Sequence, residues 1–379
     1  MKLTVLKEYL NESIQHVSKA ITSRTTIPIL SGIKIDADTS GITMTASDTD
    51  ISIQSYIPME QDELQVIELK QSGSVVLPSK FFVEIVRKLP AALVEIEVKE
   101  HFQTTIRSGS TEIQLVGLDP EEYPVMPGIE ENTRIQIPSD LLKTMIKQTA
   151  FAVSTNEATP ILTGVLWTIA DGKLKFTGCD RFRLASRETK IDVDPDFTLN
   201  NISISGKTLN ELSKILPDQN TLIDIVFAEN QVLFKMNQLL FYTRILEGTY
   251  PDTSKLIPQS FQTELVANHH ELANSIDRAY LLSREEKTNI VKMVMREDQT
   301  IEISSSSSEV GKVTEELNVE RMDGELIRIS FNSKFMLDAL KVMDSERVFI
   351  GFTGPMQPII IRPEGDSSLL QLILPYRTV

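Results

Sequence analysis

Three short segments of this sequence carry pairs of basic residues at one fixed interval. Lys80, Lys207 and Lys334 lie 127 residues apart, and each is followed seven residues later by a second cation. Those second cations are Arg87, Lys214 and Lys341. Seven residues are about two turns of an α-helix, so both cations of a pair share one helix face. Such a face is either a solvated surface or a binding surface for polyanions such as nucleic acid, and the threefold repetition favours binding.

The middle segment, residues 205–217, shows why a helix is expected around these cations. Ser205 is a candidate N-cap and Pro217 is a stop signal. Leucines recur between them at the i, i+3, i+7 spacing of a buried helical stripe: Leu209, Leu212 and Leu216. Matching segments occupy residues 78–90 and 332–344. The sequence therefore predicts three amphipathic helices, each with an apolar face and a basic face.

The composition limits what the rest of the chain can be. Its 379 residues are enough for two or three domains, and its net charge of −15 argues against nucleic-acid binding by the surface as a whole. Any such binding must therefore use local basic faces. The single cysteine, Cys179, excludes an internal disulfide and favours a reducing, cytoplasmic setting. No apolar run approaches the ~20 residues of a membrane span, and the chain opens on a strand-like alternation without a signal peptide.

The order of the predicted elements is the same in three consecutive blocks. A first helix is expected near residues 7–21, 139–153 and 271–282. The sequence Pro-Ile-Leu-Ser/Thr-Gly recurs at residues 28–32 and 160–164. We expect an α+β fold of three tandem repeats, each with two helices packed on antiparallel sheets. No Gly/Ser-rich or Pro-rich linker separates the repeats, so they should pack edge to edge. Their expected bounds are residues 1–127, 128–256 and 257–379.

The residue patterns of common catalytic and metal sites are incomplete in this sequence. Residues 201–208 end like a phosphate-binding loop, but an asparagine stands where that loop needs a glycine. His269 and His270 lack the second histidine of a zincin helix and are expected at the surface. Asp48 and Asp50, two apart on an expected strand, could hold a metal ion, although a solvated edge is favoured. The sequence thus predicts no cofactor, no metal and no catalytic residue.

The three repeats and four short motifs together resemble the bacterial sliding clamp, the beta subunit of DNA polymerase III. The motifs are Ser-Arg-Thr-Thr-Ile-Pro-Ile-Leu at 23–30, Asp-Arg-Phe-Arg-Leu-Ala at 180–185, Tyr-Pro-Asp at 250–252 and Leu-Ile-Leu-Pro-Tyr-Arg at 372–377. The resemblance covers the whole chain, and segments 207–216 and 338–341 look like those of Gram-positive clamps. It implies a processivity factor of DNA replication, an accessory polymerase subunit with no active site of its own.

The resemblance also implies a head-to-tail homodimer, in which two chains of three domains form a ring around duplex DNA. The helices would line the hole and face the phosphates, which hold position without carrying sequence information. The implied DNA-binding residues are Arg24, Lys80, Arg87, Lys143, Lys147, Lys207, Lys214, Arg278, Lys334 and Lys341. The implied dimer contact, between the first domain of one chain and the third of the other, uses Ile113, Leu115, Leu281 and Leu282. The last two leucines could instead pack within the core of the third domain.

A second implied site is an apolar pocket between the second and third domains that captures peptides carrying Leu and Phe. Such peptides belong to the DNA polymerase III alpha subunit, the clamp-loader delta subunit, other polymerases and repair proteins. The implied pocket residues are Leu162, Cys179, Asp180, Arg181, Phe182, Arg183, Leu184, Pro251, Lys255, Leu256, Pro358, Leu372, Leu374, Tyr376 and Arg377.

The chain departs from the family pattern at three positions of this pocket. Phe182 stands where a histidine is usual, Cys179 where a threonine is common, and Tyr376 where a smaller or unbranched apolar residue is found. Larger aromatic side chains would narrow the pocket. We therefore hypothesise that peptide preference differs from that of a housekeeping clamp, and that this chain is a second, divergent clamp of its organism.

Two other functions remain open from the sequence alone. A metal-dependent nuclease could use Asp48, Asp50 and Asp180, provided that these carboxylates converge. A scaffold of three repeats could bind protein partners without forming a ring, and it would not be retained on closed circular DNA. The repeat organisation disfavours the nuclease, because it places the acidic residues on different domains.

Overall fold

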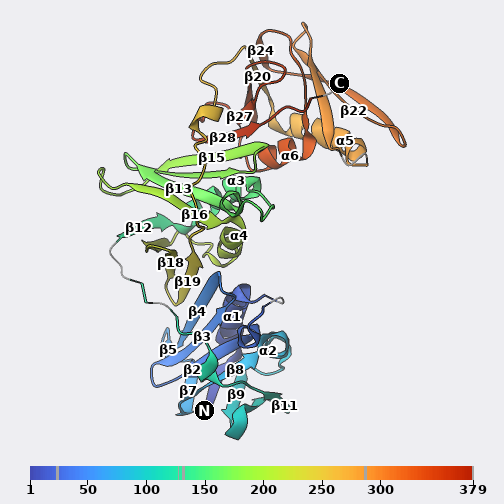
Figure 1. The fold of residues 1–379 in the computed structure, drawn as a ribbon. Helices are drawn as coiled ribbons and strands as arrows, with labels where there is room; N and C mark the ends of the chain where they lie inside the picture. The colour runs from blue at the N-terminus through green and yellow to red at the C-terminus, as the bar shows by residue number, and fades with distance from the viewer. Residues whose placement is uncertain (23–24, 127, 130–132, 286–287, 378–379) are drawn as a thin grey trace. The chain divides into compact units, whose positions relative to one another are not determined.

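The computed structural model describes residues 1–22, 25–126, 128–129, 133–285 and 288–377 (Figure 1). The chain divides into two compact units, and the division points fall inside helices α3 (Ser139–Thr149) and α4 (Gly206–Ile215) and after β19 (Leu239–Arg244). The first unit comprises Met1–Asp140 and Lys214–Ile245, and the second comprises Leu141–Ser213 and Leu246–Val379. Every strand pairing among the described residues is antiparallel, which together with the helices confirms the predicted α+β class.

Two large sheets build the first unit. One has the strand order β11-β10-β9-β1-β7, and the other has the order β12-β17-β18-β19-β4-β3-β2-β8. The strands of the smaller sheet are β1 (Lys2–Leu6), β7 (Ile67–Gln71), β9 (Leu93–Val98), β10 (Gln103–Ser108) and β11 (Thr111–Val116). The larger sheet adds β2 (Gly32–Ala37), β3 (Gly41–Ser47), β4 (Ile51–Pro58), β8 (Gly73–Pro78), β12 (Thr133–Pro138), β17 (Leu222–Phe227) and β18 (Gln231–Met236) to β19. A small hairpin joins β5 (Glu60–Gln61) to β6 (Leu64–Gln65). Because β19 pairs with β4, strands of the first two repeats share one sheet.

Two helices, α1 (Lys7–Val17) and α2 (Ser79–Lys88), pack against each other in the first unit. α1 also packs on β3 and β4. Leu10 and Ile14 of α1 and Phe82 of α2 are fully buried. Burial of one such side chain contributes about 1.5–3 kcal/mol, so the apolar stripes hold both helices on the sheets.

The second unit also contains two sheets. Its nine-stranded sheet has the order β16-β13-β14-β15-β28-β27-β26-β20-β24, and its four-stranded sheet the order β23-β22-β21-β25. The nine strands are β13 (Gly164–Ala170), β14 (Lys173–Cys179), β15 (Arg183–Lys190), β16 (Leu199–Ser205), β20 (Thr263–Asn268), β24 (Arg321–Gly324), β26 (Arg347–Phe352), β27 (Ile359–Pro363) and β28 (Leu369–Ile373). The four are β21 (Ile290–Met295), β22 (Thr300–Ser307), β23 (Gly311–Asn318) and β25 (Arg328–Asn332). The β15–β28 pairing joins the second repeat to the third within one sheet.

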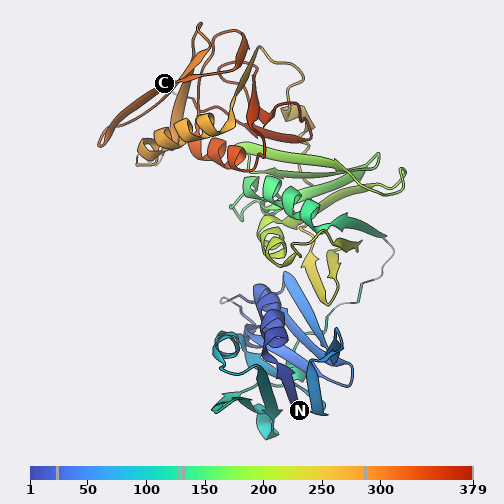
Figure 2. The same ribbon diagram turned by 180° about the vertical axis from the view of Figure 1, so that it is seen from behind.

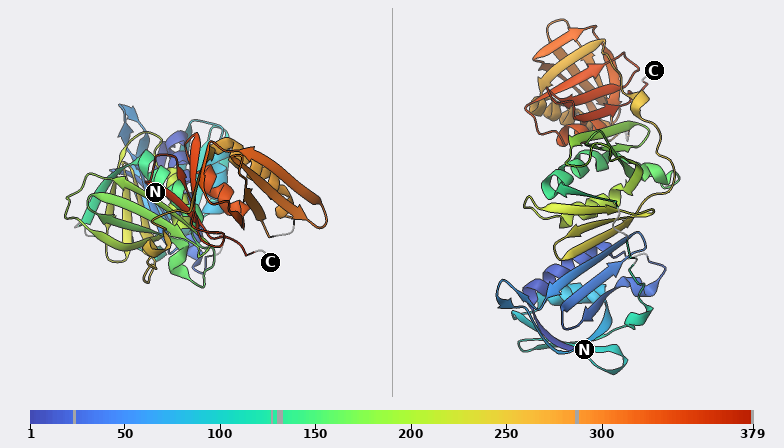
Figure 3. Two further views of the ribbon diagram at one scale, coloured as in Figure 1. Left: turned by 90° about the horizontal axis from the view of Figure 1, so that it is seen from above. Right: turned by 90° about the vertical axis from the view of Figure 1, so that its left-hand side faces the viewer.

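Helices α5 (His269–Ser283) and α6 (Ser333–Lys341) lie side by side in the second unit (Figure 2). α5 packs on the four-stranded sheet, whose orange strands form one tilted layer in the left view of Figure 3. Asparagine side chains cap both helices: Asn268 accepts a bond from the backbone N–H of Glu271, and Asn332 accepts bonds from the first turn of α6. These caps explain why the sequence starts a helix at each position.

Short 3₁₀ helices complete the described fold. They are η1 (Ser18–Ala20), η2 (Pro28–Ser31), η3 (Glu100–Phe102), η4 (Pro120–Glu122), η5 (Ala150–Ala152), η6 (Pro160–Thr163) and η7 (Ser254–Leu256). The recurring Pro-Ile-Leu-Ser/Thr-Gly sequence forms η2 and η6, and each leads directly into a strand. Among the described residues, no helix has the length and apolar character to cross a membrane.

Two expectations about local structure are wrong. Asp48 and Asp50 lie in the turn between β3 and β4, because the Asp48 carboxylate accepts the backbone N–H groups of Asp50 and Ile51 at 3.1 and 2.9 Å. His269 is buried, with its Nε2 atom 2.9 Å from the Leu340 carbonyl oxygen, because α6 packs over the start of α5. In strands β7 and β23 most side chains face solvent and lack an apolar pattern.

Candidate peptide, DNA and dimer surfaces

The floor of the candidate peptide site is an apolar cluster within the second unit. Leu162 comes from η6, Cys179 from the end of β14, Leu184 from β15 and Leu372 from β28, and all four are buried. Tyr250 and Ile360 complete the cluster. The β15–β28 pairing sets Leu184 opposite Leu372. Residues that are far apart in sequence therefore meet at one apolar surface, as a peptide site requires.

The rim of this candidate site is exposed. Its exposed members are Arg181, Phe182, Pro251, Lys255, Leu256, Leu374, Tyr376 and Arg377, and Pro358 is half-buried. The exposed fraction is 61% for Phe182 and 52% for Tyr376. These two aromatic side chains thus extend into solvent beside the apolar floor and are accessible to a bound segment. The tight turn that carries Phe182 is held by the Asp180 carboxylate, which accepts its backbone N–H at 3.0 Å.

Arg183 occupies a different position from the other basic residues of the set. Its guanidinium donates to the Asp180 and Asp338 carboxylates at 2.9 and 2.7 Å and to the Phe151 carbonyl oxygen at 2.7 Å. It also stacks on Phe335, 4.4 Å from the ring centroid, and its side chain is only 10% exposed. Arg183 lies on β15 of the second repeat, and Asp338 and Phe335 lie on α6 of the third, so Arg183 ties the second repeat to the third. Its guanidinium is thus held by Asp180, Asp338 and Phe151 at the base of the candidate site.

Burial raises the pKa of the Cys179 thiol. The thiolate is the reactive form, so less of it is present at neutral pH than in free cysteine. We expect the native protein to react with a thiol-specific disulfide reagent at pH 8 at least about tenfold more slowly than free cysteine. Urea-unfolded protein is the control and should react at the free rate. Complete reaction of the native chain within the mixing time would contradict the buried position of Cys179.

The basic helix faces predicted from the 127-residue interval are present in both units. Lys80, Arg87, Lys147, Lys207, Lys214, Arg278, Lys334 and Lys341 are exposed, and Lys143 is half-buried. Arg24 lies outside the described residues. Two of the arginines are ion-paired: Arg87 bonds Glu84 at 2.6 Å, and Arg278 bonds Glu315 of β23. The first cations of the three pairs are all exposed lysines: Lys80, Lys207 and Lys334.

The residues expected at the dimer contact lie on two separate surfaces. Ile113 and Leu115 are half-buried on β11, an edge strand of its sheet. Leu281 is 48% exposed on α5, and Leu282 is half-buried beside it. The exposure of Leu281 disfavours the alternative in which it packs within its own domain.

The sequence interpretation missed an apolar hollow next to β11. It has a volume of about 270 Å³ and is lined by Phe81, Glu84, Ile85, Lys88, Leu89, Pro90, Thr111 and Ile113. Phe81 is 54% exposed. The signal was available, because adjacent Phe81 and Phe82 cannot both lie on the buried face of one helix.

The acidic residues of the nuclease alternative do not form a metal site. Within the described residues, no group of three His, Cys, Asp or Glu side chains is placed to hold a metal ion. Asp48 is occupied with turn hydrogen bonds, and Asp180 is paired with Arg183 at 2.9 Å. The carboxylates of Asp48 and Asp180 therefore have structural partners.

Comparisons with known proteins agree over the full length of the chain. Models of the N-terminal, central and C-terminal domains of the DNA polymerase III beta subunit match residues 1–127, 136–252 and 254–377. The chain is 52% identical over 378 residues to the beta sliding clamp of Bacillus subtilis and 45% identical over 379 residues to that of Staphylococcus aureus, with 100% of each chain covered.

Solved structures give the same result. The sliding clamp of Bacillus subtilis has a TM-score of 0.97 at 51% identity, and the DNA polymerase III beta chain of Streptococcus pneumoniae has a TM-score of 0.95 at 35% identity. Both comparisons cover 100% of each chain. This full-length likeness places the fold in the class of DNA clamps. The chain belongs to the DNA polymerase III beta-subunit family, the bacterial sliding clamps of DNA replication, and resembles its Gram-positive members.

Proposed function

We propose that two copies of this chain close a head-to-tail ring around duplex DNA and hold DNA polymerase III on it. The observation that carries the proposal is the regular recurrence of exposed lysines on α2, α4 and α6 in an otherwise acidic chain. Cations confined to those helices would favour DNA there, while the net charge of −15 repels it elsewhere. Phosphate contacts carry no sequence preference, so the ring would slide. The proposed domains span residues 1–127, 128–256 and 257–379, and the family-model matches support these bounds.

The ring is proposed to close between the first domain of one chain and the third domain of the other. β11 and β23 are both edge strands, which leave backbone groups available for pairing with another chain. Leu281 would fill the hollow lined by Phe81 and Ile113. Apolar surface that is exposed in the single chain would thereby be buried, as at other homodimer contacts.

The chain is proposed to act by tethering, without an active site of its own. Partner segments bound at the candidate peptide site would keep a polymerase at high effective concentration near its DNA, so dissociation is followed by fast rebinding. The proposed partners are the DNA polymerase III alpha subunit, the clamp-loader delta subunit, other polymerases and repair proteins. Ring opening would be left to an ATP-driven loader, since the sequence has no nucleotide-binding motif. The proposed location is the cytoplasm.

The role of the helix cations is tested by reversing their charge. The triple variant Lys80→Glu/Lys207→Glu/Lys334→Glu should lose DNA affinity, and the slope of log affinity against log salt should fall by about 0.9 for each phosphate contact removed. The control is Lys190→Glu, at the exposed end of β15 and outside the helices. Equal salt slopes for the triple variant and the unaltered chain would contradict a phosphate-facing role.

Peptide preference is tested with a polymerase-derived peptide carrying Leu and Phe. We expect its affinity to differ from that for the Bacillus subtilis clamp, and Phe182→His to move the affinity toward that clamp by at least about threefold, ~0.7 kcal/mol. Isothermal titration calorimetry measures both quantities. Equal affinity for the two clamps would remove the hypothesis of a divergent second clamp while leaving the sliding-clamp function intact.

A further inference from the structure

The turn between β3 and β4 repeats the geometry of the turn that carries Phe182 in the candidate peptide site. Asp48 and Asp180 each accept two backbone N–H bonds at 2.9 to 3.1 Å, from the residues two and three positions further on. The residue after each aspartate has a positive φ angle, 88° at Thr49 and 79° at Arg181. The two turns lie 132 residues apart and are built in the same way.

The elements around the two turns correspond as well. The backbone N–H of Arg244, at the end of β19, donates to the Asp50 carbonyl oxygen at 3.1 Å. In the second unit, the N–H of Leu374, which follows β28, donates to the Phe182 carbonyl oxygen at 2.8 Å. Leu30 of η2 is buried like Leu162 of η6. The first unit therefore contains an internal copy of the framework that forms the candidate peptide site.

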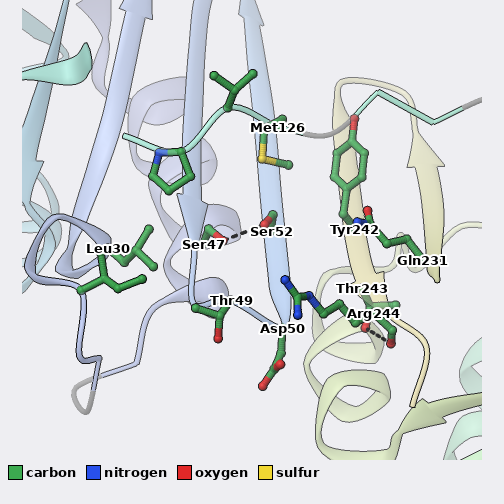
Figure 4. Close-up of a pocket in the computed structure, with 13 residues that line it drawn as sticks. Leu30, Ser47, Thr49, Asp50, Ser52, Met126, Gln231, Tyr242, Thr243 and Arg244 are labelled. Carbon is green, nitrogen blue, oxygen red and sulfur yellow. Dashed lines mark hydrogen bonds between the residues drawn. The ribbon is translucent and has the colours of Figure 1, made fainter. Parts of the chain in front are cut away.

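The internal copy encloses a hollow with a volume of about 260 Å³ (Figure 4). Its lining residues are Ile27, Leu30, Ser47, Thr49, Asp50, Ser52, Pro124, Val125, Met126, Gln231, Tyr242, Thr243 and Arg244. Figure 4 shows Arg244 extending from β19 toward the β3–β4 turn, with Tyr242 and Met126 on one side of it. The side chains that line the hollow come from two repeats, as those of the candidate peptide site do.

The side chains of the internal copy are more polar than those at the matching positions of the candidate peptide site. Ser47 stands at the position of Cys179, Ser52 at that of Leu184, Tyr242 at that of Leu372 and Arg244 at that of Leu374. Hydroxyl groups and one guanidinium thus replace four apolar groups. The Oγ atoms of Ser47 and Ser52 lie 2.7 Å apart and share a hydrogen bond.

The lining of the hollow carries one cation, Arg244, and one carboxylate, Asp50. In the part of the chain that the structure describes, Arg244 is exposed and forms no ion pair. Figure 4 shows the Asp50 side chain turned away from Arg244. Apolar side chains line the same hollow as this cation, and two of them are exposed: Ile27 by 42% and Val125 by 93%. A ligand with one carboxylate and one apolar group complements this pair of features.

We propose that this hollow is a second docking site, for a short extended segment of a partner protein in which an apolar residue stands beside an acidic one. The carboxylate pairs with Arg244, and the apolar side chain packs on Leu30 and Val125. A segment is favoured over a free anion because the apolar surface would otherwise stay in water. This proposal depends on the proposed peptide site only because the two sites share one backbone framework. It assigns a different kind of partner segment to each of the two sites.

The test is a titration of the full-length protein, labelled with ¹³C at its methionine methyl groups. The probes are the hexapeptide acetyl-Gly-Leu-Asp-Leu-Asp-Gly-amide and its neutral counterpart with asparagine at both aspartates. The acidic peptide should shift the Met126 methyl resonance saturably, and the neutral peptide should bind at least tenfold more weakly. Arg244→Ala should abolish this preference, Arg244→Lys should restore part of it, and the exposed control Arg328→Ala should leave it unchanged.

No shift at Met126, or equal affinity of Arg244→Ala and the unaltered chain, would overturn the proposal. A shift of equal size with acetate alone would also overturn it, by showing an anion site without segment recognition. Binding of a Leu/Phe peptide at the candidate peptide site is measured on the same samples. Loss of that binding alone would count against the proposed function, while loss of the Met126 response alone would count against the second site.

Discussion

Replacing Arg183 by alanine is expected to lower the free energy of unfolding of the second unit by about 3 kcal/mol. The substitution leaves the Asp180 and Asp338 carboxylates without their guanidinium and the Phe151 carbonyl without its donor. Removing one partner from a buried ion pair typically costs about 3–5 kcal/mol, and the lower end applies because Asp338 is partly exposed. Peptide affinity should fall as well, because the turn carrying Phe182 loses its support.

The measurement is urea unfolding followed by the fluorescence of Trp167, which is fully buried in the second unit and is the single tryptophan of the sequence. Arg181→Ala is the matched control. Arg181 is exposed, and its side chain donates to the Thr159 hydroxyl at 2.8 Å, so its loss should change stability by less than about 0.5 kcal/mol. Arg183→Lys should recover only part of the loss, because an ammonium cannot reach three acceptors in fork geometry. Equal stability of Arg183→Ala and the unaltered chain would show that the network does not join the two repeats.

Leu281→Asp is expected to weaken the dimer by at least 100-fold. A carboxylate placed in the apolar contact with Phe81 and Ile113 would lose its hydration without gaining a partner, at a cost of about 3 kcal/mol for each of the two contacts in a ring. Light scattering and sedimentation over a range of concentrations measure the mass. The unaltered chain should stay near twice 42.6 kDa at low micromolar concentration, and the variant should approach 42.6 kDa.

Leu326→Asp is the control for this dimer prediction. Leu326 is 50% exposed, close to the 48% of Leu281, and it lies in the segment between β24 and β25. The same change of charge there should leave the dimer intact. A dimer that persists in Leu281→Asp at the concentrations where it persists in the control would place the contact elsewhere on the chain.

The helices were predictable because their signals are local. The 127-residue interval locates α2, α4 and α6. The leucines at i, i+3 and i+7 in and directly after α4 are buried, as that spacing requires. The Pro-Ile-Leu-Ser/Thr-Gly repeat was also visible in the sequence, but its 3₁₀ helices η2 and η6 were not predicted from it. The assignment of site residues came from the resemblance and stays a prediction.

Long-range pairing and burial of polar groups were not predictable in this way. The joining of β15 to β28 brings Leu184 to Leu372 across nearly two hundred positions, and no local pattern encodes that choice. The buried position of His269 depends on α6 packing over it. β23 is an edge strand with a largely exposed surface, so it lacks the apolar alternation by which strands are recognised.

The most direct test of encirclement is topological. The chain is loaded onto a nicked circular plasmid by a bacterial clamp loader with ATP, separated from free protein at 200 mM salt, and then treated with an enzyme that cuts the plasmid once. A closed ring predicts retention on the circle and loss within minutes after linearisation, as the ring slides off the ends. Retention on the linear product, or failure to be retained on the circle, would contradict a ring around DNA.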